Sequence, residues 1–155
     1  MQAADVGYAV LPDGRGSANV ESVVYTDAMG FDRKRSLEAF KTTVSFALVL
    51  QDLDVAANGP EGVLHWLAWN IPVKAGGIPE GSLPEGAVVG TAGVGRGNYF
   101  GPGAPAGPRY HHYVFELYAL SATLNLPADA TRAQLLDAMK DIIVGKAAYV
   151  GRFRQ

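Results

Sequence analysis

The stretch that decides the fold reads His111-His112-Tyr113-Val114-Phe115-Glu116-Leu117-Tyr118-Ala119-Leu120. Its side chains alternate with a period of two, which is typical of a β-strand. One face groups His111, Tyr113, Phe115, Leu117 and Ala119, and the other carries His112, Val114, Glu116, Tyr118 and Leu120. The pattern predicts a strand over residues 110–120.

Two more stretches alternate in the same way. In residues 44–50, Val44-Ser45-Phe46-Ala47-Leu48-Val49-Leu50, the largest apolar side chains share one face, and the same parity brings Asp52 and Asp54 to its end. In residues 63–71, one side carries Val63, His65, Leu67, Trp69 and Ile71. Residues 19–26 and 87–91 are shorter candidate strands.

The helical signal lies near the C-terminus. Thr131 and Gln134 have the spacing of a capping box, in which each side chain satisfies a free backbone N–H at the start of a helix. Helical spacing then continues through Leu135, Met139, Ile142 and Ile143. A short helical turn is also expected over residues 32–40. The pattern predicts a β-rich α+β domain and not a doubly wound α/β sheet.

Length and composition restrict the class of protein. The 155 residues, 48% of them apolar, fit a single domain over residues 1–155, and no stretch is long and apolar enough to span a bilayer. The net charge is −2, and Arg33-Lys34-Arg35 is the one basic run, so we expect no nucleic-acid binding. The absence of cysteine excludes disulfides, a thiol nucleophile and a zinc–thiolate site.

Asp52 and Asp54 are the first candidates for chemistry. Alternation directs both carboxylates to one side, where the apolar face runs into the loop 55–61. Two like charges this close disfavour joint ionisation unless a cation or a donor lies nearby. Three interpretations stay open: a loop that caps its own backbone amides, a metal-binding Asp-x-Asp pair, and an anion or acid–base pocket.

The histidines are the second group of candidates. His65 shares its predicted face with apolar residues, so it is either a hydrogen-bonded core residue, with one of the aspartates as its partner, or part of a site. Alternation separates His111, on the side of Phe115, from His112, which we expect at the surface or in a second layer.

The glycine- and proline-rich segment 90–108 suits a rigid pocket wall, because glycine lets backbone N–H groups approach an anion. It lacks the Gly-Lys-Ser/Thr of a nucleotide loop, and no Gly-x-Ser-x-Gly or other sign of an activated serine occurs in the chain.

In their order, these pieces resemble the phosphatidylethanolamine-binding protein (PEBP) family, and within it the bacterial branch described as Raf-kinase-inhibitor-like. The resemblance covers about residues 43–151. It rests on Ser45-Phe46-Ala47-Leu48, Asp52-Leu53-Asp54, His65-Trp66, Asn70-Ile71-Pro72, Gly101-Pro102 and residues 111–120. It implies a central antiparallel sheet, a second smaller sheet and a C-terminal helix. It also implies a ligand pocket formed by Asp52, Asp54, His65, Gly101, Pro102, His111 and Tyr113.

Some positions depart from the family pattern. Leu53 replaces the proline between the aspartates, and Ala56 stands where a further proline is common. His112 occupies the arginine position of the family's His-Arg-Tyr motif, and Gly103-Ala104-Pro105 stands in for a Cys-Pro-Pro-like turn. These changes leave the ligand preference open.

The sequence and the resemblance together predict a binding protein and not an enzyme, with no metal or cofactor. Its ligand is expected to be a phosphate-type anion or a phospholipid headgroup, held between an aspartate-bound imidazole and the Gly-Pro loop. One alternative is an interaction protein that docks on a kinase or another regulator, and a weaker one is a hydrolase that uses His and Asp as general base and acid. We allow for a homodimer. We expect a cytoplasmic location, or a periplasmic or secreted one if the N-terminus is a trimmed mature end.

Overall fold

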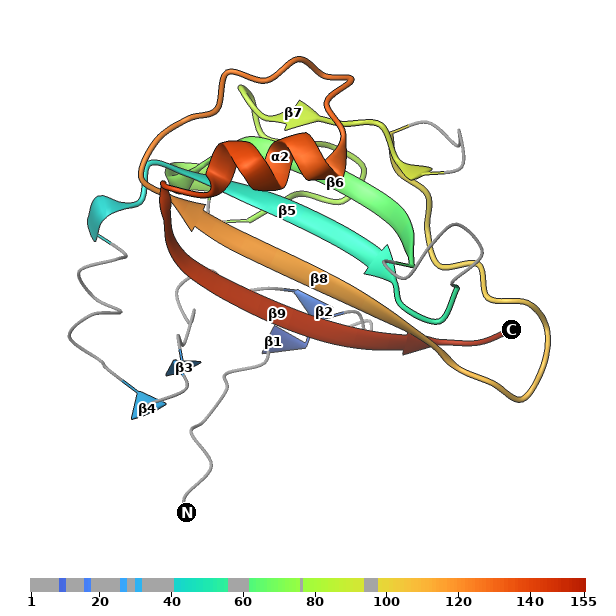
Figure 1. Cartoon of the computed structure of the whole chain (residues 1–155). Coiled ribbons are helices and arrows are strands. Elements are labelled where there is room, and N and C mark those ends of the chain that lie inside the picture. Colours follow the sequence, from blue (N-terminus) through green and yellow to red (C-terminus); the bar gives the residue numbers. More distant parts are fainter. Residues whose placement is uncertain are drawn as a thin grey trace.

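The computed structural model describes residues 9–10, 16–17, 26–27, 30–31, 41–55, 62–75, 77–93 and 98–155. Its centre is a five-stranded antiparallel sheet in the order β7-β6-β5-β8-β9 (Figure 1). The strands are β5 (Ser45–Asp52), β6 (Val63–Pro72), β7 (Val88–Val89), β8 (His111–Leu120) and β9 (Ile143–Phe153). The predicted antiparallel sheet is confirmed, and the three long predicted strands are β5, β6 and β8.

Short elements complete the described part of the chain. β1 (Ala9–Val10) pairs with β2 (Gly16–Ser17), and β3 (Thr26–Asp27) pairs with β4 (Gly30–Phe31), so the smaller sheets have two strands each. A 3-10 helix, η2 (Val73–Ala75), follows β6, and α2 (Arg132–Met139) precedes β9. The predicted strand 19–26, except its last residue, and the predicted turn 32–40 lie outside the described residues.

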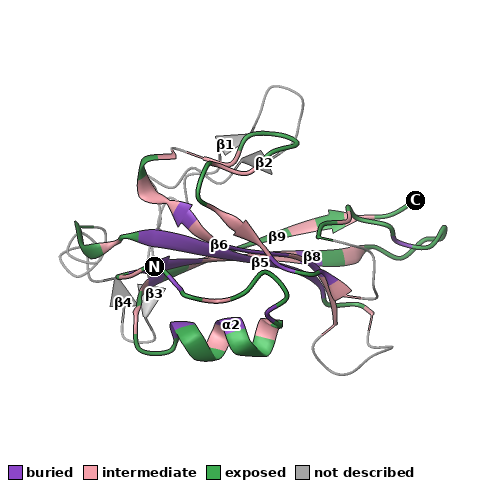
Figure 2. Cartoon of the chain, turned by 90° about the horizontal axis from the view of Figure 1, so that it is seen from above, coloured by how far each residue is buried: buried purple, intermediate pink, exposed green. Residues whose placement is uncertain are grey.

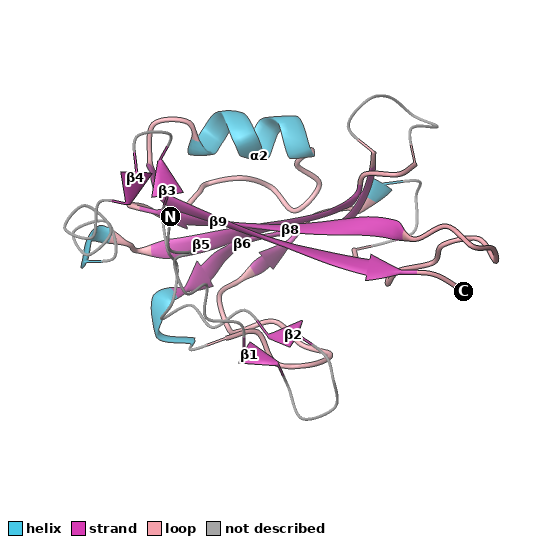
Figure 3. Cartoon of the chain, turned by 90° about the horizontal axis from the view of Figure 1, so that it is seen from below, coloured by secondary structure: helices cyan, strands magenta, loops and turns pink. Residues whose placement is uncertain are grey.

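Strand β5 lies between β6 and β8, and all eight of its residues are buried because both faces of the sheet are covered. Figures 2 and 3 show α2 lying over one face. The core on that face consists of Ala47, Val49, Leu67, Trp69, Tyr118, Leu120, Leu124, Ala130, Leu135 and Met139. The core on the opposite face consists of Phe46, Leu48, Ala68, Ile71 and Ala119.

The C-terminal helix begins at the predicted capping box. The Gln134 N–H donates to Thr131 Oγ1 at 3.2 Å, and the Thr131 N–H donates to Gln134 Oε1 at 2.8 Å. The helix ends at Met139, however, so the predicted continuation through Ile142 and Ile143 is wrong. Ile143 instead begins β9, which pairs with β8 from Leu120 back to His111. Among the described residues, no helix has both the length and the apolar character to traverse a lipid bilayer.

Two bulges interrupt the alternation of β6. Phe46 pairs with Ile71 and Leu48 with Ala68, so β6 carries an extra residue beside Asn70, whose φ of 55° is left-handed. Ile71 therefore lies in the core on one face of the sheet, whereas Leu67 and Trp69 lie in the core on the other face. The prediction that these three residues share a face is wrong. The second bulge lies at His65, because Leu50 pairs with Trp66 and Gln51 with Leu64.

Candidate functional site

The buried carboxylate of Asp52 is the centre of the site. Asp52 ends β5 opposite Tyr113 of β8, and its residue is only 2% exposed. Its Oδ1 accepts the backbone N–H of Asp54 at 2.9 Å, and its Oδ2 lies 2.6 Å from His111 Nδ1. Because Nδ1 is the proton donor to a carboxylate, the second ring nitrogen of His111 is left for another partner. The predicted contact between an aspartate and a histidine is thus present, and the histidine is His111.

Asp54 takes part in a second, exposed pair. Its Oδ2 accepts the backbone N–H of His112 at 2.5 Å and lies 3.0 Å from His112 Nδ1. The chain bends at Leu53, whose N–H donates to the His112 carbonyl at 3.0 Å, so strand alternation stops after Asp52. The prediction that Asp54 faces the same site as Asp52 is therefore wrong. The N–H of His112 holds the pKa of the Asp54 carboxyl below its usual value.

His65 is buried beside these pairs at the bulge in β6. Its Nδ1 donates to the Phe100 carbonyl at 2.9 Å, since a carbonyl oxygen only accepts. Its ring centroid lies 3.9 Å from that of Phe100 and 5.2 Å from that of Tyr113, edge-on. The hydrogen-bond partner of His65 is thus a backbone carbonyl and not an aspartate. A bulge often re-aims a side chain, and here it accompanies the placement of His65 against Tyr113.

Tyr113 joins the strand to the Gly-Pro loop. Its hydroxyl accepts the Gly103 N–H at 3.3 Å, and its ring lies 6.4 Å from that of His111. Burial raises the pKa of the Tyr113 phenol, and the negative charge of Asp52 adds to this shift. Gly101 and Pro102 are exposed, and Gly103 is the residue through which this loop bonds to Tyr113.

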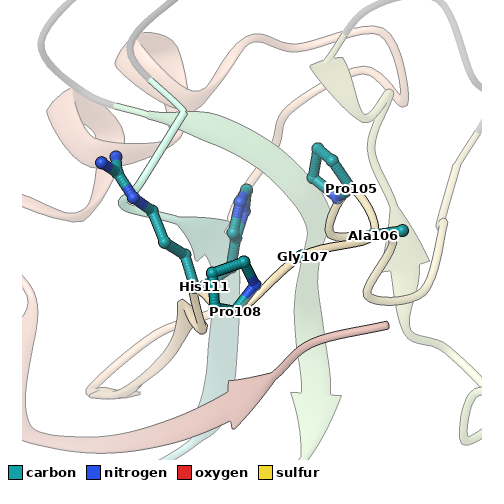
Figure 4. Close-up of a pocket in the computed structure, with 6 residues that line it drawn as sticks. Pro105, Ala106, Gly107, Pro108 and His111 are labelled. Carbon is teal, nitrogen blue, oxygen red and sulfur yellow. The ribbon is translucent and has the colours of Figure 1, made fainter.

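A depression of about 220 Å³ opens next to His111. It is lined by Pro105, Ala106, Gly107, Pro108, Arg109 and His111. Figure 4 shows Pro108 next to His111, with Pro105 and Ala106 beyond Gly107. Residues 105–108 of the proline- and glycine-rich segment line this depression, whereas Gly101 and Pro102 are not among its lining residues. His111 is the residue that both contacts Asp52 and lines the depression.

The structure thus brings together Asp52, His111, Tyr113 and His65, and places Asp54 in the adjoining exposed pair with His112. Among residues 41–55, 62–75, 77–93 and 98–155, no cluster of three or more His, Asp or Glu side chains is arranged to hold a metal ion. Asp52 and Asp54 bond to different histidines, so they are not one Asp-x-Asp ligand pair.

Sequence reasoning missed three contributors to the site. Arg109 lies two residues before His111, and this spacing could have suggested that both residues line the same depression. The carbonyl of Phe100 and the N–H of Gly103 are backbone groups, which no residue type identifies. His112 is exposed, as predicted, but its contact with Asp54 was not expected.

Comparisons with known proteins identify the family. The sequence pattern described as Phosphatidylethanolamine-binding protein matches residues 28–154. The chain belongs to the PEBP family. A "UPF0098 protein" from Methanothermobacter thermautotrophicus is 37% identical over 117 residues, which cover 72% of this chain and 74% of the relative. The UPF0098 protein PH1269 from Pyrococcus horikoshii is 37% identical over 119 residues, and the match spans 58% of that protein.

Solved structures agree with this assignment to the PEBP family. The crystal structure of the PEBP homologue CT736 from Chlamydia trachomatis has a TM-score of 0.68 and 28% identity, and the match covers 74% of each chain. YbcL from Escherichia coli has a TM-score of 0.64 and 25% identity, again over 74% of each chain. The resemblance to the PEBP family inferred from the order of the sequence motifs is confirmed.

Proposed function

We propose that this PEBP-family protein binds a phosphate-type anion, free or as part of a headgroup, in the depression beside His111. The observation that supports the proposal is the double role of His111. Its Nδ1 lies 2.6 Å from the buried Asp52 carboxylate, and its ring lines the depression. An imidazole placed between a buried carboxylate and an open depression is suited to hold a proton that it donates to an anion.

The chemistry assigned to each residue follows from its contacts. Asp52 accepts from His111 Nδ1 and fixes the ring, and when the ring carries a second proton its outer nitrogen donates to an anion oxygen. His65 and Tyr113 pack behind this pair and hold the loop that carries Phe100 and Gly103. Gly101 and Pro102 lie between Phe100 and Gly103 and complete the predicted ligand set in this proposal.

The proposal is tested by titrating inorganic phosphate into ¹⁵N-labelled protein and following backbone amide shifts. We expect saturable shifts in the wild type, and at least about a tenfold loss of affinity in His111→Asn and Asp52→Asn, because each removes a charge-assisted hydrogen bond. Lys140→Gln is the matched control, since Lys140 is exposed and follows α2 at the opposite end of β8 and β9. A His111→Asn protein that is folded and titrates like the wild type would refute the site.

In this proposal the site binds and does not catalyse. In the described part of the chain, no serine or threonine hydroxyl bonds His65, His111 or His112, so the histidine–aspartate pairs have no hydroxyl nucleophile to activate. We expect no turnover of p-nitrophenyl phosphate or p-nitrophenyl acetate. Turnover that is lost in Asp52→Asn would contradict this. The location, the homodimer and a regulatory protein partner stay predictions from the sequence.

A further inference from the structure

The two histidine–aspartate pairs supply no net positive charge to the proposed anion site. Asp52 lies 2.6 Å from His111, and Asp54 lies 3.0 Å from His112. Each pair is neutral when its imidazole is protonated and carries one negative charge when it is not. Tyr113 adds no positive charge, because a phenol is either neutral or negative. In every protonation state, a phosphate at this site therefore needs a cation other than these pairs.

Residues 105–108, called the wall below, line the depression but offer an anion few backbone donors. Pro105 and Pro108 have no backbone N–H. The N–H of Gly107 donates to the backbone oxygen of Gln155 at 3.4 Å. The wall therefore provides at most one further N–H, that of Ala106, and its side chains carry no charge. The charge that holds an anion has to come from a side chain outside the wall.

Arg109 meets this requirement. Among the described residues that line the depression, it is the one with a permanent positive charge. It is exposed and, within the described part of the chain, its guanidinium forms no ion pair. Arg152 cannot replace it, because Arg152 pairs with His112 and so lies on the face of the sheet opposite to His111. Arg109 is therefore the cation available to an anion in the depression.

We propose that Arg109 makes the depression selective for phosphomonoesters over phosphodiesters. This inference rests on the proposed function, because His111 supplies the other contact. The guanidinium fork of an arginine binds two phosphate oxygens, and the outer nitrogen of His111 binds one. A phosphomonoester presents three terminal oxygens and carries about 1.5 to 2 negative charges at pH 7, whereas a phosphodiester presents two terminal oxygens and carries one charge. The monoester therefore satisfies both residues together, and its larger charge favours the doubly protonated ring of His111.

A phosphomonoester has two sources, a free phosphorylated molecule and the headgroup of phosphatidic acid in a membrane. The soluble probes are methyl phosphate and dimethyl phosphate, which differ by one methyl group on a phosphate oxygen. The membrane probes are phosphatidylcholine vesicles that contain either phosphatidic acid, a monoester, or phosphatidylglycerol, an anionic diester. A preference confined to the soluble pair indicates a free ligand, and one confined to the vesicles indicates a headgroup. A preference in both pairs indicates that the phosphate alone is recognised.

The experiment measures affinity for the soluble probes from amide shifts at about pH 7.5, where the monoester is largely a dianion, and affinity for the vesicles by sedimentation. In the wild type we expect the monoester of at least one pair to bind about three- to tenfold more tightly than the diester, the size of a partly exposed charge-assisted contact. Arg109→Gln should bring this ratio toward one. The matched control is Arg152→Gln, which removes the same charge from the opposite face and should keep the wild-type ratio.

The outcomes separate the two proposals. Equal affinity for monoesters and diesters in the wild type overturns the selectivity and leaves phosphate binding in place. A ratio that persists in Arg109→Gln, or that falls equally in Arg109→Gln and Arg152→Gln, also overturns it, because the effect is then not that of a residue in the depression. If inorganic phosphate and every probe fail to bind the wild type, the proposed function itself is wrong and the selectivity with it.

Discussion

Asp54 and His112 are joined twice, because one carboxylate oxygen of Asp54 accepts both the backbone N–H and the ring Nδ1 of His112. The backbone N–H of Asp54 in turn donates to Asp52, whose other oxygen contacts His111. A series of hydrogen bonds therefore connects an exposed pair with a buried one. His112, at the arginine position of the family motif, is therefore linked to Asp52 through Asp54.

The first prediction concerns acid stability. The His112 N–H lowers the pKa of Asp54 in the folded chain below the ordinary value of 3.8. The folded state then binds fewer protons than the unfolded state, so this stabilisation is present above pH 3.8 and is lost as the pH falls through the folded pKa. Asp54→Asn should make the acid loss of stability shallower. Urea unfolding between about pH 2 and pH 6 measures this.

A matched control for this prediction is Asp129→Asn, which changes an exposed aspartate away from the site. The acid limb of the Asp129→Asn stability curve should stay closer to the wild type than that of Asp54→Asn. If both variants have the same acid limb, the contact between Asp54 and His112 does not contribute to stability in solution.

The second prediction concerns Tyr113 at high pH. Burial, helped by the charge of Asp52, raises the pKa of its phenol above 10.0 in the folded chain. Above pH 10.0 the unfolded chain loses this proton while the folded chain keeps it, so folding stability falls as the pH rises. Tyr113→Phe should remove this part of the alkaline loss. It should also cost about 1 kcal/mol at neutral pH, because the Gly103 N–H loses its acceptor.

Unfolding in urea at about pH 7 and about pH 10.5 separates the two effects of Tyr113→Phe. The variant should be the less stable protein at the lower pH, and its difference from the wild type should shrink at the higher pH. A difference that is equal at both pH values would show that the phenol does not titrate differently in the folded and unfolded chains.

The fold was predictable where local pattern and tertiary position agree. β5 and β8 have an unbroken period of two, and their pairing from Ser45 with Leu120 to Asp52 with Tyr113 has no bulge. The capping box of Thr131 was likewise visible, because its contacts are local. Residues 143–153 were not predicted as a strand, since the alanine and lysine residues within them also suit a helix. Only the pairing with β8 makes this segment a strand.

The candidate site was predictable in part for the same reason. Strand parity places Asp52, His111 and Tyr113 correctly, because all three lie in regular strand. It fails for Asp54, which follows a bend, and for Ile71, which follows a bulge. Alternation cannot reveal a bend or a bulge. The residues that follow such an irregularity are therefore assigned to the wrong face.

The third prediction tests the bulge at Asn70. Its left-handed φ of 55° is unfavourable for most side chains, but its amide donates to the Leu124 carbonyl at 2.9 Å and accepts the Leu124 N–H at 2.8 Å. Asn70→Ala loses both bonds and keeps the strained φ, so it should cost about 2–4 kcal/mol. Asn70→Gly loses the same bonds but relieves the strain, so it should cost about 1 kcal/mol less. Urea unfolding at pH 7 ranks the variants, and equal losses would exclude a role for φ.

The last prediction uses a pair of glycines that share a backbone conformation. Gly62 and Gly81 have φ values of 75° and 74°, but a methyl group at Gly62 would lie 2.0 Å from the Asp52 carbonyl oxygen, whereas nothing lies within 4 Å at Gly81. Gly81→Ala should therefore cost about 1 kcal/mol from backbone strain alone. Gly62→Ala should cost about 2 kcal/mol more, because the backbone of Asp52 has to shift.

The two glycine variants also separate stability from binding. Since Gly62→Ala displaces the residue that orients His111, the folded variant should bind inorganic phosphate more weakly than the wild type, whereas Gly81→Ala should bind it equally well. Both are measured under conditions in which each protein is folded, as judged by its amide spectrum. If Gly62→Ala is as stable as Gly81→Ala and keeps wild-type phosphate affinity, the close packing of Gly62 on Asp52 does not hold the site in place.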